Sequence, residues 1–432
     1  MELTWGNTAL GMRCLGFGEE VDHAVDFSLG FSSYHSTESG FDNTERSSGI
    51  KMGFLRMDNK WEIMRVPLDY GVKIDFVQYN AQLDELFAER SGAGVRFTHW
   101  DSKIDQLTST FSGYTALNWQ PAHGLTLKPG FVTQVTLSTI SPTFEPRLRI
   151  SWQPGGDDRQ EWSLATGRYL QVMEAISDER DAGTVFYVYK PVDREDPLPE
   201  SLHSIMGYRR QIGNLVDISV EGYAKRHRNI PVARWTREPG NTIVTALADG
   251  TTWGADVQAE FNRGRFYLLF GYGLSKTEYR ADANDLVAWI DRDVFRYNPP
   301  HDRRHQLNLI TSMKFAGLTA NAIWQYSSGN PYTKLFAIDM LLDVSTQHPL
   351  TDRGRMVSLY SEPFDGRFPS FRRLDVSLSR PFRLAPGFTL EAEIGAVNAY
   401  NVQNIFYFDV NTMQQVDELP FLPYLSLSFR LS

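Results

Sequence analysis

Apolar and polar residues alternate along most of the chain, and the alternation is clearest between residues 305 and 327. From His305 to Phe315 most odd positions are apolar and most even positions are polar. After Ala316 and Gly317, the even positions from Leu318 to Tyr326 are apolar and most odd positions are polar. A period of two is typical of β-strands, whose successive side chains point to opposite faces. The stretch therefore predicts an antiparallel hairpin with one apolar and one polar face.

The length of this hairpin indicates a membrane protein. Strands of soluble proteins usually have about five or six residues. Each limb here has about ten, the length that a tilted strand needs to cross a bilayer. We therefore expect the apolar face to meet lipid and the polar face to meet water.

The same alternation predicts about seventeen strands over the whole chain. We expect them at residues 3 to 14, 22 to 36, 48 to 65, 69 to 82, 107 to 120, 125 to 138, 144 to 153, 159 to 173, 199 to 212, 214 to 228, 250 to 262, 265 to 280, 302 to 315, 318 to 330, 368 to 384, 387 to 399 and 420 to 432.

The connections between these strands alternate in length. Short turns rich in Gly, Pro, Asn or Asp are expected at 67, 121 to 124, 154 to 158, 213, 263 to 264, 317 and 386 to 387. Long polar connections are expected at 83 to 106, 174 to 198, 229 to 249, 281 to 301, 331 to 367 and 400 to 419. Membrane barrels have short periplasmic turns on one rim and long extracellular loops on the other. The predicted fold is an all-β, transmembrane, antiparallel up-and-down barrel rather than a soluble sandwich or propeller.

Composition changes this picture little. Of 432 residues, 42% are hydrophobic, yet no run approaches the length of a transmembrane helix. The net charge of -9 gives no reason to expect nucleic-acid binding, and the single cysteine, Cys14, excludes an intrachain disulfide framework. Aromatic residues make up 13% of the chain, which suits interfacial girdles but also occurs in soluble sandwiches.

Several stretches, taken in order, resemble one known family. They are WGNTALGMRC (5 to 14), FEPRLRISWQ (144 to 153), WSLATGRYLQ (162 to 171), MGYRRQIGNLVDISVEGYAKRHRNIP (206 to 231), NPPHDRRHQLNL (298 to 309), YSSGNPYT (326 to 333) and the segment from 371 to 432. Their order and spacing resemble the C-terminal part of the barrel of TonB-dependent outer-membrane receptors. One departure is the ending from Phe429 to Ser432, because members of that family often finish on an aromatic residue.

The resemblance implies a partial barrel domain over residues 1 to 432, corresponding to the last seventeen of twenty-two strands. A signal peptide, a TonB box, a plug domain and the first strands would then precede it. The implied location is the outer membrane of a Gram-negative bacterium. The implied function is TonB-dependent active uptake of a scarce, bulky ligand such as an iron chelate (siderophore), cobalamin or a glycan.

The implied partners are outer-membrane lipid, the plug domain, the TonB complex acting through the missing N-terminal part, and a small-molecule or oligomeric ligand. We expect no nucleic acid and no cofactor. A passive, porin-like diffusion channel of about sixteen to eighteen strands is the alternative function. The sequence has no GxSxG, HExxH or GxxxxGK[ST] motif, so we predict no enzyme, although a barrel hydrolase with scattered Ser, His and Asp remains open.

Candidate ligand-binding residues lie in the long connections and on the polar face. Aromatic and arginine side chains are the usual anchors of recognition surfaces, or they pack loop on loop. The loop candidates are Arg234, Trp235, Arg237, Trp289, Arg292, Phe336 and Arg353. On the polar face, Arg147 and Arg149 would attract an anion or a plug carboxylate, or else pair with carboxylates such as Glu161.

The densest polar cluster runs from His301 to His305 and contains Arg303, a further candidate. Adjacent strand residues point to opposite faces, so at most alternate members could converge on a metal ion. We therefore predict no metal site. The resemblance implies instead a structural element near the outer rim.

Overall fold

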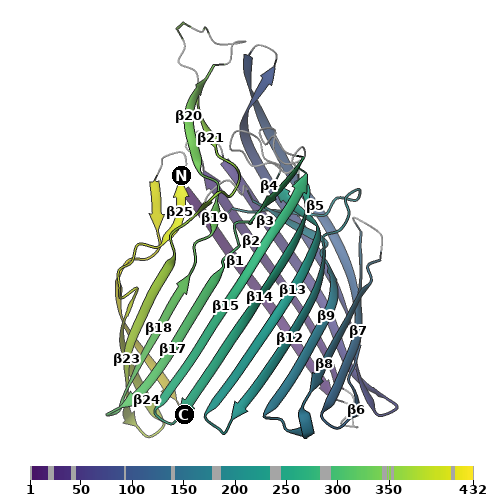
Figure 1. Ribbon diagram of the computed structural model, residues 1–432, viewed down its shortest axis with the longest axis vertical. Coiled ribbons are helices and arrows are strands. Elements are labelled where there is room, and N and C mark those ends of the chain that lie inside the picture. Colours follow the sequence, from purple (N-terminus) through teal and green to yellow (C-terminus); the bar gives the residue numbers. More distant parts are fainter. Residues whose placement is uncertain are drawn as a thin grey trace.

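The computed structural model of the protein describes residues 2–17, 24–39, 45–91, 94–137, 142–177, 186–233, 245–282, 293–342, 348, 350–351, 355–409 and 414–431. Within them, one sheet of 19 strands curves around an interior space (Figure 1). Two of these strands, β6 (Trp119–Ala122) and β16 (Val294–Tyr297), are short. The other seventeen form the wall and are β1 (Glu2–Phe17), β2 (Ala24–Ser39), β3 (Glu45–Ile63), β4 (Val66–Ser91), β5 (Gly94–Leu117), β7 (Leu125–Thr136), β8 (Glu145–Trp152), β9 (Gln160–Leu170), β12 (Glu200–Ile212), β13 (Val216–Ala233), β14 (Thr245–Arg263), β15 (Phe266–Asp282), β17 (His305–Phe315), β18 (Leu318–Ser327), β23 (Phe371–Ala385), β24 (Phe388–Val397) and β27 (Leu422–Leu431).

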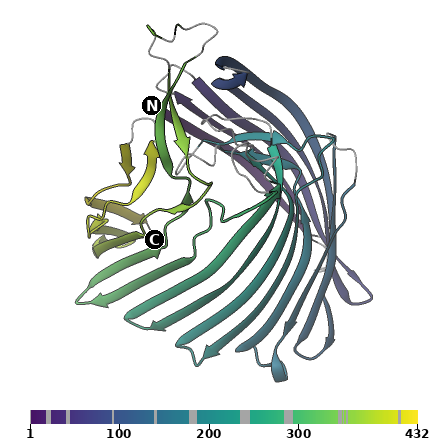
Figure 2. The same cartoon turned by 45° about the horizontal axis from the view of Figure 1, so that its top comes forward.

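Each wall strand pairs antiparallel with the next wall strand along the chain, so the sheet is a meander. All the predicted strands are present. Among the described residues, β1 pairs only with β2, and β27 pairs only with β24. Figure 2, with the top of the molecule turned forward, shows the sheet bending round from β1 toward β27.

Short turns form the lower rim in Figure 1, where the C-terminus also lies. The turns at Gly213, Gly264, Gly317 and Gly387 are confirmed, and each of these glycines has a positive φ. The turn predicted at Pro67 is wrong by a few residues. It lies at Met64 and Arg65, which have φ of 50° and 69° and form a two-residue hairpin turn. Neither residue type signals that turn, whereas Pro67 belongs to β4.

Long connections form the opposite rim, but the one predicted at 83 to 106 is wrong. β4 continues to Ser91 and β5 begins at Gly94, and their backbones pair without interruption up to Ser91 and Gly94. The pair stands above the rest of the sheet (Figure 1). Pairing of a two-stranded ribbon needs no apolar face, so the loss of alternation in the sequence did not mark the end of the strands.

Four further pairs of short strands lie within the long connections, which the sequence did not predict. They are β10 (Met173–Ile176) with β11 (Val188–Pro191), β19 (Pro331–Tyr332) with β22 (Gly366–Arg367), β20 (Leu335–Leu341) with β21 (Arg355–Tyr360), and β25 (Ile405–Asp409) with β26 (Gln414–Asp417). A 3₁₀ turn (Pro154–Gly156) joins β8 to β9 on the lower rim.

The two faces of the wall differ as the alternation predicts. Outward-facing Met206, Trp253 and Ile394 are 57%, 53% and 58% exposed. The inner face is polar; for example, Gln325 Nε2 on β18 donates a hydrogen bond of 3.3 Å to Asn308 Oδ1 on β17. No helix in the described part of the chain is long and apolar enough to span a membrane.

Buried apolar side chains gather at the mouth, the upper rim in Figure 1. The first mouth core comprises Ile176, Val232, Ala233, Ala246, Ala248, Tyr279, Ala281, Phe295, Tyr297 and Phe364. The second mouth core comprises Ala81, Leu83, Phe186 and Val188. Both cores combine ends of wall strands with residues of long connections, so they fix those connections to the wall.

Candidate ligand-binding site in the lumen

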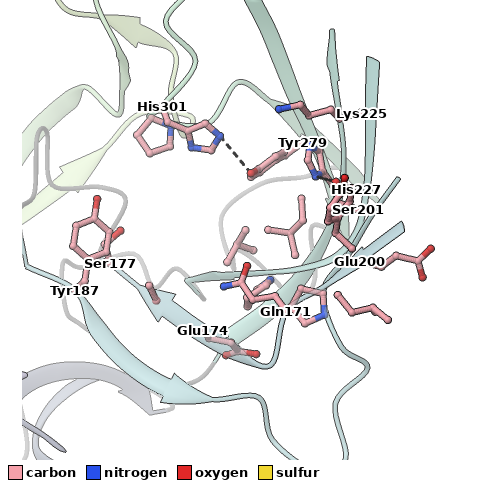
Figure 3. Close-up of a pocket in the computed structure, with 18 of the residues that line it drawn as sticks. Gln171, Glu174, Ser177, Tyr187, Glu200, Ser201, Lys225, His227, Tyr279 and His301 are labelled. Atoms are coloured by element: carbon pink, nitrogen blue, oxygen red, sulfur yellow. Dashed lines mark hydrogen bonds between the residues drawn. The ribbon is translucent and has the colours of Figure 1, made fainter. Parts of the chain in front are cut away.

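A cavity of about 910 Å³ lies on the inner side of the wall, below the mouth (Figure 3). Strands β9, β12 and β13 supply one side of its lining, and the β10–β11 hairpin supplies another. The turn before β17 adds His301 and Arg303, and Tyr279 and Asn330 also line the cavity. A volume of this size is typical of sites for small organic ligands, which occupy about 300 to 1,000 Å³.

The β10–β11 hairpin reaches this position because it folds back into the mouth. Ile176, at the end of β10, belongs to the first mouth core on β13 to β16. Phe186 and Val188, at the start of β11, belong to the second mouth core on β4. The exposed fractions of Phe186 and Val188 are 1% and 2%, so both anchors are buried. The hairpin is therefore held at two separate parts of the wall.

A buried ion pair lies within the same hairpin. Lys190 Nζ is 3.4 Å from Glu174 Oε2 and 2.8 Å from Asp193 Oδ2. Burial raises the pKa of Glu174, and the nearby ammonium of Lys190 only partly opposes this. Burial alone would lower the pKa of Lys190, but the hydrogen bond to Asp193 and the charge of Glu174 raise it. Glu174 lines the cavity, and the ammonium of Lys190 compensates the charge of its carboxylate.

A bulge in β13 adds apolar residues to the cavity wall. The register of β13 against β14 shifts between His227 and Ile230, so one extra residue changes which positions face inward. His227 pairs with Gly250, and Ile230 pairs with Ala248, two positions further on the same face. Ile230 therefore follows His227 into the cavity lining.

Hydrogen bonds connect polar side chains across four neighbouring wall strands. The hydroxyl of Ser201 on β12 lies 2.7 Å from His203 Nε2 and 2.9 Å from Nδ1 of His227 on β13. Nε2 of His227 is 3.2 Å from the Thr252 hydroxyl, which is 3.0 Å from that of Thr277 on β15. Each of these bonds restricts a side chain, so Ser201, His203 and His227 present fixed hydrogen-bonding groups to the cavity.

The turn before β17 is anchored by Asp302, which is completely buried. Its carboxylate accepts a hydrogen bond of 2.8 Å from the Thr277 backbone amide and one of 3.0 Å from Arg304 Nε. It also accepts one from Arg367, on β22. Arg367 Nη1 in turn donates to the carbonyls of Asp302 and Gly329 at 3.0 and 3.2 Å. We call this arrangement the Asp302 clasp.

The Asp302 clasp explains the polar cluster at 301 to 305. Asp302 points into the protein, whereas its neighbours His301 and Arg303 line the cavity. His301 Nε2 lies 3.4 Å from the Tyr279 hydroxyl (Figure 3), and Arg303 Nε donates to Asn330 Oδ1 at 2.8 Å. Among the described residues, no group of His, Cys, Asp or Glu could hold a metal ion.

The predicted candidates lie in different places. Arg303 lines the cavity. Arg147 and Arg149 lie on β8 but outside the lining: Arg147 pairs with Glu145 at 3.1 Å, and Arg149 lies 3.9 Å from Glu161. Phe336 lies on β20, is 80% exposed and is not in the lining. Arg234, Trp235, Arg237, Trp289, Arg292 and Arg353 lie outside the described residues.

Sequence reasoning missed most of the lining. Ser201, His203, Lys225 and His227 lie on predicted strands, and the structure places them in the lining on the polar inner face. Their common feature is that they are the polar-face residues nearest to the long connections. That feature is readable from the sequence, whereas the hairpin that covers them is not.

Sequence comparison found no family model and no curated protein that matches the chain. Solved structures match its fold. The outer membrane transporter YddB from Escherichia coli is 12% identical, with a TM-score of 0.59 over 99% of this chain and 63% of that one. The pyoverdine outer membrane receptor FpvA from Pseudomonas aeruginosa PAO1, bound to pyoverdine, is 12% identical, with a TM-score of 0.63 over 100% and 62%. The copper transporter OprC is 11% identical, with a TM-score of 0.62 over 98% and 65%.

These matches confirm the predicted fold. The chain has the antiparallel meander of the barrels of TonB-dependent outer-membrane receptors, over nearly its whole length. It spans less than two thirds of the length of each of the three proteins.

Proposed function

We propose, from the fold shared with TonB-dependent outer-membrane receptors, that this chain is most of the barrel of such a receptor. It lies in the outer membrane of a Gram-negative bacterium and takes part in active uptake of a scarce ligand from outside the cell. The observation that carries this proposal is the fold match over nearly the whole chain, combined with a lined cavity just below the long-loop rim.

In this proposal, the cavity and the long loops above it make the first contacts with the ligand. Arg303 and the fixed side chains of β12 and β13 contact it within the lumen, and the loop candidates contact it at the mouth. One structural neighbour, FpvA, is bound to pyoverdine, and another, FecA, is a ferric citrate transporter. An iron chelate is therefore our first candidate ligand. A plug domain and the TonB complex are the proposed partners.

The test is uptake of a radiolabelled ligand panel of iron chelates, cobalamin and oligosaccharides. The full gene product is expressed in a bacterium without its own receptors for these ligands, with and without functional TonB. We expect uptake of one ligand that is lost without TonB or when the proton-motive force is dissipated. No uptake of any ligand by surface-exposed, folded protein would contradict the proposal.

A passive porin is the second candidate. The polar inner face and the hairpin folded into the mouth favour it, because water-filled pores need such a lining and are narrowed in this way. Uptake that is independent of TonB, together with steady open channels in planar bilayers, would support the porin instead.

A further inference from the structure

Four charged side chains line the cavity, and they differ in whether their charge is compensated. The two carboxylates are paired: Glu174 lies 3.4 Å from Lys190 Nζ, and Glu200 lies 3.0 Å from Arg168 Nη2. The two cations, Lys225 and Arg303, form no ion pair with a carboxylate in the part of the chain that the structure describes.

The nearest partners of these cations are uncharged. Lys225 Nζ lies 5.2 Å from the centroid of the Tyr223 ring, and Arg303 donates from Nε to the side-chain oxygen of Asn330. His203 pairs directly with Lys225 across β12 and β13, and the nearby hydroxyls are engaged with the histidines. The uncompensated charge of the cavity is therefore positive.

The two cations come from separate elements that are each held in place. Lys225 lies on β13, which pairs along its length with β12 and β14. Arg303 follows Asp302, whose buried carboxylate fixes the turn to β15 and β22. A ligand that contacts both cations would gain from preorganised charges, because little side-chain ordering remains to be done on binding.

Besides polar side chains such as Gln171 and Ser201, the lining has an apolar and aromatic part. Leu170, Ala175, Ile230, Pro231 and Val232 line the cavity, and Tyr187 offers a ring that is 38% exposed. Such surfaces bury the body of a ligand, whereas a few placed polar groups fix its orientation. A simple hydrated ion would leave this apolar surface without a partner.

We propose that the cavity binds a small organic anion with a flat apolar body, whose negative groups contact Lys225 and Arg303. This inference rests on the proposed function and narrows it, because it names the charge and shape of the ligand that the receptor accepts. Glu174 and Glu200, already paired, do not repel such an anion as two free carboxylates would.

Equilibrium binding to the purified, folded chain in detergent tests this inference. The probes are isophthalate, its uncharged analogue isophthalamide, and glutarate, a dicarboxylate without a ring. We expect isophthalate to bind best and isophthalamide at least tenfold more weakly, since a charged hydrogen bond is worth about a factor of ten or more. Binding of isophthalate should weaken as salt is raised.

Variants locate the charge. Lys225→Met and Arg303→Met should each weaken isophthalate binding about tenfold, whereas Lys225→Arg, which keeps the charge, should retain most of it. Arg149→Met is the matched control, because Arg149 is a cation on the wall that lies outside the cavity lining. The comparison of isophthalamide with isophthalate uses the unaltered protein. A folding defect in a variant therefore cannot affect this test of charge selectivity.

Three results would overturn the inference. Equal binding of isophthalate and isophthalamide would show that charge does not select the ligand. An equal loss of isophthalate affinity in Arg149→Met would show that the anion responds to the overall positive potential of the lumen rather than to a specific site. Lost stability in the Lys225 and Arg303 variants without any isophthalate binding would show that these cations hold a carboxylate of the protein itself. If any of these results is found but ligand uptake requires TonB, the proposed function stands and only this inference fails. If isophthalate binds selectively but no ligand is taken up, the inference about the cavity stands and the proposed function fails.

Discussion

The wall and the mouth of this molecule place their apolar side chains on opposite sides. In the wall, Met206 and Ile394 point outward and are more than half exposed, at 57% and 58%. At the mouth, Phe186 and Val232 point inward and are 1% and 2% exposed. The apolar side chains of the wall thus form an outer surface suited to contact with lipid. Those of the mouth pack into buried cores of the kind found in water-soluble domains. The two regions should respond to mutation in different ways.

Phe186→Ala should have the largest effect at the mouth. Removal of the ring from the second mouth core should cost about 3 to 5 kcal/mol of the local opening free energy of the β10–β11 hairpin. Hydrogen exchange at the amides of β11 measures this. Phe336→Ala is the matched control, because Phe336 is 80% exposed on another loop and should cost less than about 0.5 kcal/mol. Similar losses in both variants would show that the hairpin is not anchored by its core.

Asp302→Asn should loosen the Asp302 clasp by about 3 kcal/mol, at the lower end of the range for breaking a buried ion pair. The lower value applies because the side chains of Arg304 and Arg367 are 36% and 35% exposed, so water screens them. The lower stability of the clasp should appear as reduced protection of the Thr277 backbone amide from hydrogen exchange, because this amide donates to Asp302. Asp365→Asn, which removes a partly exposed partner of Lys334, should change it little. Unchanged protection in Asp302→Asn would contradict the clasp.

Val257→Arg and Gln258→Arg compare the two faces of one central wall strand. Val257 lies on the outer face of β14, and an arginine in contact with lipid should cost about 2 to 4 kcal/mol near the bilayer midplane, less toward either rim. Gln258 faces the lumen beside Asp256 and Glu260, so an arginine there should be tolerated. Folding into vesicles, followed by denaturant titration, measures both. Equal costs would contradict the assigned faces.

The smallest expected effect is a pH dependence of the mouth. The pKa of Glu174 is raised in the folded protein, so folding favours its protonated form and stability should fall as pH rises above the ordinary carboxyl range. The raised pKa of Lys190 acts in the same direction, with a loss only above the ordinary lysine pKa. Thermal unfolding between pH 4 and about pH 9 should therefore show a slight decline that Glu174→Gln removes. A decline that persists in Glu174→Gln, or stability that rises with pH in the unaltered protein, would contradict the assignment.

Sequence alone predicted the wall because lipid and water impose opposite demands on alternate residues. On β17 and β18, the alternation specified both the strands and their faces, and a minimal turn at Ala316 and Gly317 set the register. The turn at Met64 and Arg65 escaped notice because nothing in those residue types favours a positive φ.

The mouth could not be predicted in this way. Ile176 and Phe186 are buried by residues that lie far away in the sequence, so no local period marks them. The bulge after His227 reverses the inward positions of β13. Its signals, Asn229 with a φ of 53° and Pro231, are equally typical of a strand end, so the predicted strand stopped at 228. Arg303 was selected from its polar surroundings, whereas Lys225 and His203 needed the cavity to be seen.

The Asp302 clasp has a consequence for how this protein could diversify. Arg367 bonds to the carbonyl of Gly329, and β19 pairs with β22, so the two ends of a long loop are held together at its base. Phe364, near the second end, belongs to the first mouth core, but the residues from 335 to 360 can be lengthened, shortened or exchanged while the base keeps its shape. The clasp thus separates a part of the chain that is free to vary from a cavity whose lining stays constant.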